Sequence, residues 1–112
     1  MDTDGLIHAG SGLDQVTWMD VRVGDWVATP RHGKPVEINA LWYNALCTMD
    51  MLQARFGDND DSYRQLASLV KASFNKRFWN ENTGCLYDVV DEDDDTILQN
   101  QIYAVSLPFT ML

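Results

Sequence analysis

The sequence has few cysteines, few basic residues and no long apolar run. It contains 2 cysteines in 112 residues, and 8 Lys and Arg against 17 Asp and Glu, for a net charge of −9. Two isolated cysteines do not make the disulfide framework of a small secreted domain. The acidity argues against nucleic acid and anionic membrane surfaces as partners, because both need a basic face. No segment approaches the roughly 20 apolar residues of a membrane span, and MDTDGLIHAG lacks the basic and apolar regions of a signal peptide. We therefore expect a cytoplasmic, reduced protein with no nucleic acid and no membrane partner.

Motifs for metals and phosphates are also missing. His8, His32, Cys47 and Cys85 do not have the spacing of zinc ligands. The acidic runs that start at Asp58 and Asp91 have neither the Gly at the sixth position nor the Glu at the twelfth position of a calcium loop. The sequence has no Gly-rich phosphate loop and no nucleophile elbow. We expect no metal and no cofactor.

What the sequence does contain is an ordinary hydrophobic fraction of 46 %, enough for one folded domain. Apolar residues recur at steps of three and four between Val36 and Arg55, which predicts a helix that Gly57 ends. This helix is apolar on two faces, so we expect it to be buried on two sides, with faces formed by Ile38, Leu41, Trp42, Ala45, Met49, Leu52 and Phe56, and by Ala40, Tyr43, Cys47, Met51 and Ala54. A second amphipathic helix is predicted from Ser62 to Arg77, and the pair forms an antiparallel hairpin.

The rest of the chain is less regular. Residues 1–17 are rich in Gly, Asp and Ser, and indicate a loop. Residues 78–90 predict two extended pieces around the turn at residues 80–84, that is, a short β-hairpin. Residues 91–95 form an acidic run that is typical of a solvated loop, and residues 101–112 have helical character that Pro108 interrupts. The fold class predicted is all-α, built from helical hairpins.

The chain is organised around residues 17–42, where aromatic rings alternate with charges before a helix begins at Pro35. Tryptophan faces lie flat on the C–H surfaces of pyranose rings, and charged groups reach sugar hydroxyls. This mixture suits a sugar pocket. Trp18 is the best candidate for a sugar platform, whereas Trp42 lies on the apolar side of its helix and is expected in the core. Trp26 is open to either role.

Three blocks of this sequence carry a resemblance to a known family. They are TWMD at residues 17–20, TPRHGKPVEINALW at residues 29–42 and NQIYAVSLP at residues 100–108. Together they resemble the amylo-α-1,6-glucosidase domain of glycogen debranching enzymes, and the match spans nearly the whole chain. The chain departs from the family at Leu98-Gln99, where Arg-Pro usually precedes Asn-Gln.

The family domain is an (α/α)6 toroid of several hundred residues, so the resemblance implies that this chain is a slice of one. The loop at 1–34 would belong to the active site, 35–78 would be a helix pair, 79–99 a hairpin and acidic loop, and 100–112 the start of the next helix. Both ends look like cuts into the larger domain. Helices of a slice lack neighbours, so we expect exposed apolar faces and self-association through them.

The resemblance also implies a reaction. Glycoside hydrolysis needs one carboxylic acid at the leaving oxygen and one carboxylate on the far side of the ring. Asp20 takes the role of the general acid by resemblance, and Trp18 beside it could raise the pKa of its carboxyl group. The competing interpretation is a turn or capping aspartate. Arg31, Lys34 and Glu37, together with Gln101, are expected at the glucosyl-binding site; from the residues alone, the first three could equally form a surface ion-pair set.

The partner carboxylate is the difficulty, because in the family it lies beyond the end of this chain. The candidates within the chain are Asp25, Glu37 and Asp88, but we expect Glu37 to bind a sugar hydroxyl or to pair with Arg31 or Lys34. The sequence therefore predicts part of an enzyme that hydrolyses α-1,6-linked glucose at branch points of glycogen or a branched α-glucan, by inversion, and that is inactive alone. The alternative is a non-catalytic glucan-binding or oligomerising helical module.

Overall fold

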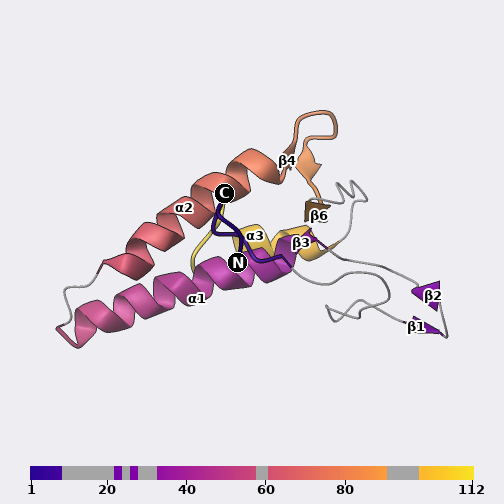
Figure 1. Cartoon of the computed structure of the whole chain (residues 1–112). Coiled ribbons are helices and arrows are strands. Elements are labelled where there is room, and N and C mark those ends of the chain that lie inside the picture. The colour runs from indigo at the N-terminus through magenta and orange to yellow at the C-terminus, as the bar shows by residue number, and fades with distance from the viewer. Residues whose placement is uncertain (9–21, 24–25, 28–32, 58–60, 91–98) are drawn as a thin grey trace.

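The computed structural model describes residues 1–8, 22–23, 26–27, 33–57, 61–90 and 99–112 (Figure 1). Two long antiparallel helices, α1 (Val36–Arg55) and α2 (Ser62–Arg77), form its body. Their bounds are those that the apolar periodicity predicts. The C-terminal segment and a short N-terminal segment pack onto this pair, so a mostly helical fold is confirmed.

The ends of α1 follow from the local sequence. Pro35 precedes the helix with extended backbone, φ −68° and ψ 143°, and the fixed φ of proline suits this position. Glu37 lies in the first turn and Arg55 in the last turn, each with the sign that the helix dipole favours. Gly57 follows with a φ of +78°, a left-handed conformation that glycine adopts readily.

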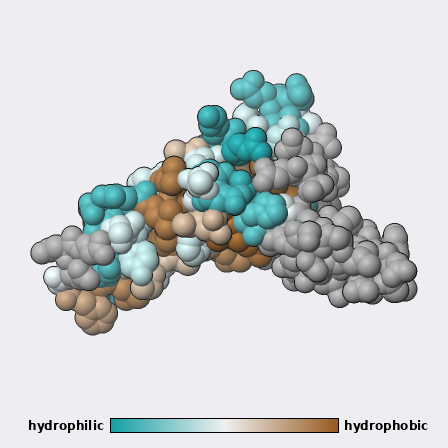
Figure 2. Space-filling view, viewed as in Figure 1, coloured by the Kyte–Doolittle hydropathy of each residue, from teal (hydrophilic) through white to brown (hydrophobic). Residues whose placement is uncertain are grey.

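Burial of α1 differs from the sequence prediction. One side carries Val36, Ala40 and Leu46 into the core. On the opposite side lies a row that we call the α1 outer stripe, in which 46 % of Leu41, 41 % of Met49, 37 % of Leu52 and 82 % of Phe56 are exposed. Figure 2 shows apolar surface along the lower edge of the molecule, where α1 runs in Figure 1. The prediction that both sides of α1 are buried is therefore wrong for this chain, because no second layer of described residues covers the stripe.

The core lies between α1, α2 and the two terminal segments. Ala67, Val70 and Phe74 of α2 lie in the core, and they are spaced three and four residues apart. Phe74 stacks on Phe78 with ring centroids 4.4 Å apart. The remaining buried apolar residues are Leu6, Val36, Ala40, Leu46, Leu86, Val89, Val90, Ala104 and Met111.

Gly5 brings the N-terminal segment close to α2. Its φ is +83°, and a Cβ atom at this position would lie 3.0 Å from Cγ2 of Val70. Only glycine combines this backbone conformation with so close an approach. The segment therefore lies directly against the helix pair.

The strands are two residues long and pair antiparallel in three places. β1 (Arg22–Val23) pairs with β2 (Trp26–Val27), and β4 (Trp79–Asn80) pairs with β5 (Cys85–Leu86), which is the predicted hairpin. β3 (Lys34–Pro35) pairs with β6 (Val89–Val90), with Lys34 opposite Val90 and Pro35 opposite Val89. Residues 85–90 were predicted as one extended piece. In the structure they form two strands, of which β5 pairs with β4 and β6 pairs with β3.

The C-terminal segment is only briefly helical. A 3₁₀ turn, η1 (Gln99–Ile102), leads into α3 (Tyr103–Ser106). Leu107 then takes an extended conformation with ψ 157°, as expected for a residue before proline. The helix thus ends at Ser106, two residues before the interruption predicted at Pro108.

Two features are absent from the described part of the chain. None of the helices that they form is long and apolar enough to cross a membrane. No group of three or more His, Cys, Asp or Glu side chains among them is placed to hold a metal ion.

Candidate functional site

The beginning of α1 gathers segments that lie far apart in the sequence. β3 and the first turn of α1 come from the block at 29–42, and η1 and α3 come from the block at 100–108. Both η1 and α3 contact α1, and β6 pairs with β3 (Figure 1). We call the region formed by β3, the first turn of α1, β6 and η1 the α1 N-terminal site. Two of the three blocks that carry the family resemblance therefore meet at one place.

Lys34 is buried at this site, with 6 % of its surface exposed. Its Nζ lies 2.9 Å from Oδ2 of Asp4 and 3.1 Å from Oδ2 of Asp2. The other carboxylate oxygen of Asp4 accepts a hydrogen bond from the backbone N–H of Leu6. Burial raises the pKa of Asp4, but the hydrogen bonds and the positive charge of Lys34 outweigh it, so the pKa lies below its usual value of 3.8. Lys34 thus ties the N-terminal segment to the beginning of α1.

Glu37 and Asn39 occupy the first turn of α1, and both are buried, at 1 % and 0 % exposed. Asn39 holds the N-terminal segment: its Oδ1 accepts a hydrogen bond from the N–H of Ile7 at 2.7 Å, and its Nδ2 donates to the carbonyl of Ile7 at 3.1 Å. The same Nδ2 donates to the carbonyl of Pro35 at 3.0 Å. A side chain amide that pairs with both backbone groups of one residue acts like a neighbouring strand.

Asp88 and Gln101 complete the α1 N-terminal site. The carbonyl of Asp88 accepts a hydrogen bond from the N–H of Val36 at 2.8 Å, which satisfies one of the first N–H groups of the helix. The Asp88 residue is 2 % exposed. Oε1 of Gln101 accepts a hydrogen bond from the N–H of Leu86 at 3.4 Å, and Asn100 beside it is fully buried. The site therefore has a polar interior.

The structure does not test the whole predicted set. Trp18, Asp20 and Arg31 lie outside the described residues, as do Asp25 and the departure from the family at Leu98. Of the described candidates, Lys34, Glu37 and Gln101 come together at the α1 N-terminal site. Trp42 is half-buried and packs against the core, as expected for its helix face.

Sequence reasoning missed the anchoring role of asparagines on the helix pair. Besides Asn39, Asn44 on α1 accepts a hydrogen bond from the N–H of Phe109 at 2.9 Å and donates to its carbonyl at 2.8 Å. Asn75 on α2 donates to the carbonyl of Met111 at 2.7 Å. The signal was present, because asparagine is a poor helix former and needs a reason to lie within a helix.

Comparison with known proteins gave one match. The family model described as amylo-alpha-1,6-glucosidase matches residues 1–112. Neither the curated proteins nor the solved structures gave a significant match. The match covers the whole chain and includes the two blocks that meet at the α1 N-terminal site. The chain therefore belongs to the amylo-alpha-1,6-glucosidase family.

Proposed function

We propose that this chain contributes to the hydrolysis of α-1,6-linked glucose at branch points of glycogen or a related α-glucan. The observation that carries the proposal is the family match over residues 1–112. The substrate is a glucan in this proposal, the helix pair is a slice of an (α/α)6 toroid, and the compartment is the cytoplasm. The acidic chain is compatible with a neutral glucan, which has no charge to repel.

The reaction proposed is acid–base hydrolysis with inversion. Asp20 is assigned as the general acid that protonates the leaving oxygen, because it occupies the last position of the TWMD motif. Trp18 is assigned as a platform for a glucosyl ring, and Arg31 as a donor to sugar hydroxyls. Arg31 lies three positions before β3 in the sequence, so the chain leads from it into the α1 N-terminal site.

The structure supports a division of roles among the other assigned residues. Lys34 was expected to contact sugar, but its ammonium group is buried between Asp2 and Asp4. We therefore assign Lys34 a positioning role, in which it fixes the end of the loop that carries Asp20. Glu37 is 1 % exposed, so we assign it a positioning role as well. Gln101 remains assigned to the glucosyl-binding site.

Hydrolysis by this chain alone is not expected. A general base must contact the attacking water within hydrogen-bond reach. Glu37 and Asp88 are only 1 % and 2 % exposed, which argues against that role for either one. We propose that the base is supplied from outside these 112 residues.

The test measures binding and turnover separately. The purified chain is mixed with a phosphorylase limit dextrin; glucose release is assayed, and binding is followed by affinity electrophoresis. Asp20→Asn removes the proton donor with little change of shape, and Asp61→Asn is the matched control at an exposed position next to α2. We expect all three proteins to bind the dextrin equally and none to release glucose.

Two results would contradict this proposal. Release of glucose that Asp20→Asn abolishes would show that a base is present in the chain or its oligomer, and Asp25 would become the first target. If none of the three proteins binds the dextrin although their circular dichroism spectra are native, the glucan-binding role is contradicted.

The α1 outer stripe favours a second candidate, an oligomerising helical module. Its residues Leu41, Met49, Leu52 and Phe56 all lie along one exposed side of a 20-residue helix. Leu52→Glu places a charge in the middle of the stripe, and Gln65→Glu on exposed α2 is its control. Sedimentation velocity should show a dimer that Leu52→Glu alone converts to monomer; a monomeric parent protein would exclude this candidate.

A further inference from the structure

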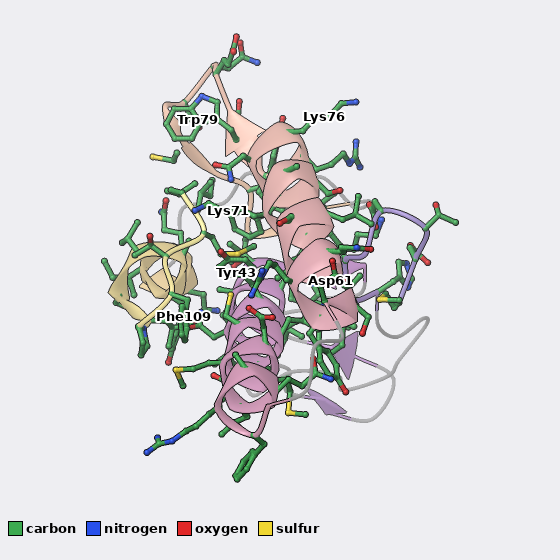
Figure 3. The ribbon with its side chains drawn as sticks, turned by 90° about the vertical axis from the view of Figure 1, so that its left-hand side faces the viewer. Tyr43, Asp61, Lys71, Lys76, Trp79 and Phe109 are labelled. Atoms are coloured by element: carbon green, nitrogen blue, oxygen red, sulfur yellow. The ribbon has the colours of Figure 1, made fainter. Side chains whose placement is uncertain are left out.

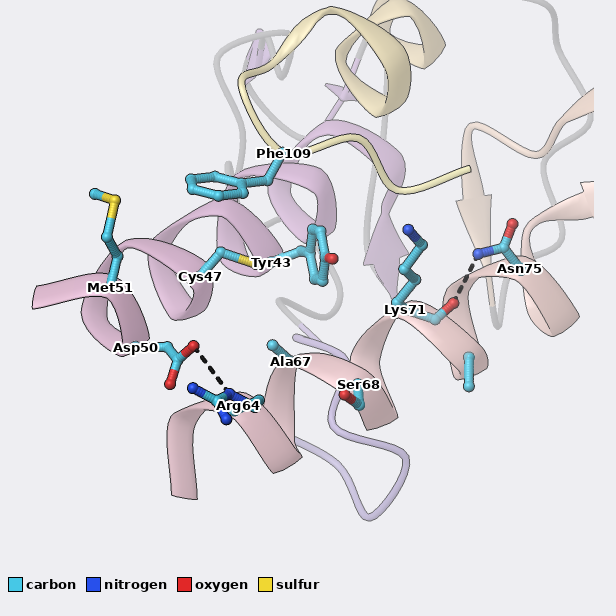
Figure 4. A pocket seen from close by; sticks show the side chains of 11 residues that line it. Tyr43, Cys47, Asp50, Met51, Arg64, Ala67, Ser68, Lys71, Asn75 and Phe109 are labelled. Atoms are coloured by element: carbon cyan, nitrogen blue, oxygen red, sulfur yellow. Dashed lines mark hydrogen bonds and ion pairs between the residues drawn. The ribbon is translucent and has the colours of Figure 1, made fainter. Parts of the chain in front are cut away.

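A cavity of about 540 Å³ opens between α1 and α2 (Figure 4), within the usual size range of small-molecule sites. We call it the Tyr43 pocket. It holds none of the residues assigned above to the glucosyl-binding site. Its lining residues are Tyr43, Cys47, Asp50 and Met51 of α1, Arg64, Ala67, Ser68, Lys71, Ala72 and Asn75 of α2, and Phe109 of the C-terminal segment.

The pocket has an apolar body. The rings of Tyr43 and Phe109 lie on the same side of it as Cys47, and Ala67 lies across from them (Figure 4). Phe109 is held in place through its backbone, which makes two hydrogen bonds with Asn44. The aromatic wall is therefore fixed by contacts outside the pocket, and is available to a flat apolar group without rearrangement.

Most polar groups of the pocket already have partners. Arg64 Nε and Asp50 Oδ2 form an ion pair at 3.3 Å. Nδ2 of Asn75 donates to the carbonyls of Lys71 and Met111 at 2.8 and 2.7 Å. A polyhydroxylated ligand would lose many hydrogen bonds with water and find few here, which disfavours a sugar.

Lys71 differs in that its charge is not paired within the described part of the chain. Its ammonium group lies 5.9 Å from the centroid of the Tyr43 ring, and it has no ion pair with any described residue. Figure 3 shows Lys71 directed toward Tyr43, whereas Lys76, further along α2, points away. In a chain of net charge −9, the ammonium group of the half-buried Lys71, beside an aromatic wall, is a local site of positive charge. A carboxylate could pair with it without disturbing its contact with the ring.

We propose that the Tyr43 pocket binds a small organic anion with an apolar body, of the class of aromatic carboxylates. The carboxylate pairs with Nζ of Lys71, and the ring of the ligand packs against Tyr43 and Phe109. This site does not depend on the proposed hydrolysis, because it shares no residue with it.

The probe for the test is 1-naphthoate, titrated into the 15N-labelled protein and followed by amide chemical shifts. 1-Naphthalenemethanol, which has the same ring without the charge, is the neutral comparison. Lys71→Met keeps the apolar stem and removes the charge, and Lys76→Met makes the same change outside the pocket. Saturable shifts are expected around residues 43–51 and 64–75. Lys71→Met should weaken binding by about tenfold, the effect of losing one charge-assisted hydrogen bond, and Lys76→Met should not.

A second variant keeps the test decisive if Lys71→Met does not fold. Ser68→Phe fills the pocket from an exposed position on α2 and leaves the charge in place; it should abolish the shifts. The proposal is overturned if 1-naphthoate gives no saturable shifts up to about 10 mM, far above the affinity of a formed site. It is also overturned if the neutral alcohol binds equally well, if both lysine variants weaken binding equally, or if maltotriose occupies the pocket in its place.

Discussion

The indole Nε1 of Trp42 donates a hydrogen bond to the carbonyl oxygen of Gly5 at 2.9 Å. The two residues are 37 positions apart, and Gly5 is buried. One tryptophan in the middle of α1 thus packs on the core and also fixes the N-terminal segment that covers it.

Trp42→Phe should remove this hydrogen bond and keep an aromatic ring. We expect a loss of about 1 to 3 kcal/mol in the free energy of unfolding, because the buried carbonyl of Gly5 loses its donor. Urea denaturation followed by circular dichroism measures the change. Trp79→Phe is the control, since Trp79 is 44 % exposed; equal losses in both variants would mean that ring size rather than the hydrogen bond matters.

Gly5→Ala should destabilise the fold more than Gly84→Ala does. Both glycines have positive φ, +83° and +70°, so each substitution carries the backbone strain of about 1 to 2 kcal/mol. A Cβ at Gly5 also meets Val70 at 3.0 Å, whereas a Cβ at Gly84 meets no described atom within 4 Å. Thermal unfolding of the two variants separates the packing effect from the backbone effect. Identical melting temperatures would show that the N-terminal segment is not packed on α2.

The ion pairs of Lys34 predict a dependence of stability on pH. Since the pKa of Asp4 is lowered in the fold, its contribution is fully present above the unfolded value of 3.8 and is lost as the pH falls through the lower folded value. Asp4→Asn should therefore destabilise the protein at pH 6 and have less effect at pH 2.5. Urea unfolding at both pH values measures this. A parallel shift of Asp4→Asn at both pH values would exclude the ionic origin.

Asn39→Ala should be among the most damaging single substitutions. It removes three hydrogen bonds from a fully buried side chain and leaves the N–H and carbonyl of Ile7 without their partner. We expect a loss of about 2 to 4 kcal/mol. Hydrogen exchange of the Ile7 amide should accelerate, because its hydrogen bond to Asn39 is lost. Asn82→Ala, on the exposed turn between β4 and β5, is the control and should change stability by less than about 0.5 kcal/mol.

The helix pair could be predicted from the sequence because its signals are local. The apolar steps from Val36 to Arg55 and the glycine after them act within a few residues of the first helix. The proline at 108 acts in the same local way on the C-terminal helix. The hairpin of β4 and β5 followed in the same way from the turn at 80–84. These elements appear at the predicted positions.

The pairing of β3 with β6 could not be predicted, because the strands are two residues long and more than 50 residues apart. No periodicity can be read from two residues. The burial of Lys34 depends in turn on Asp2 and Asp4, which sequence reasoning placed in a loop. The family blocks pointed to the beginning of α1, but the contacts that build this region depend on backbone groups as far as 52 residues away, as between Val36 and Asp88.

We expect the long-range hydrogen bonds of α1 to form after the helix pair. α1 and α2 are neighbours in sequence, so they can meet early, whereas the hydrogen bonds of Asn39, Asn44 and Val36 close loops of 32, 65 and 52 residues. Two of these late contacts, those of Asn39 and Val36, lie at the α1 N-terminal site. Denaturant or heat should therefore dismantle it before the helix pair melts, so a preparation with full helical signal can still lack a formed site.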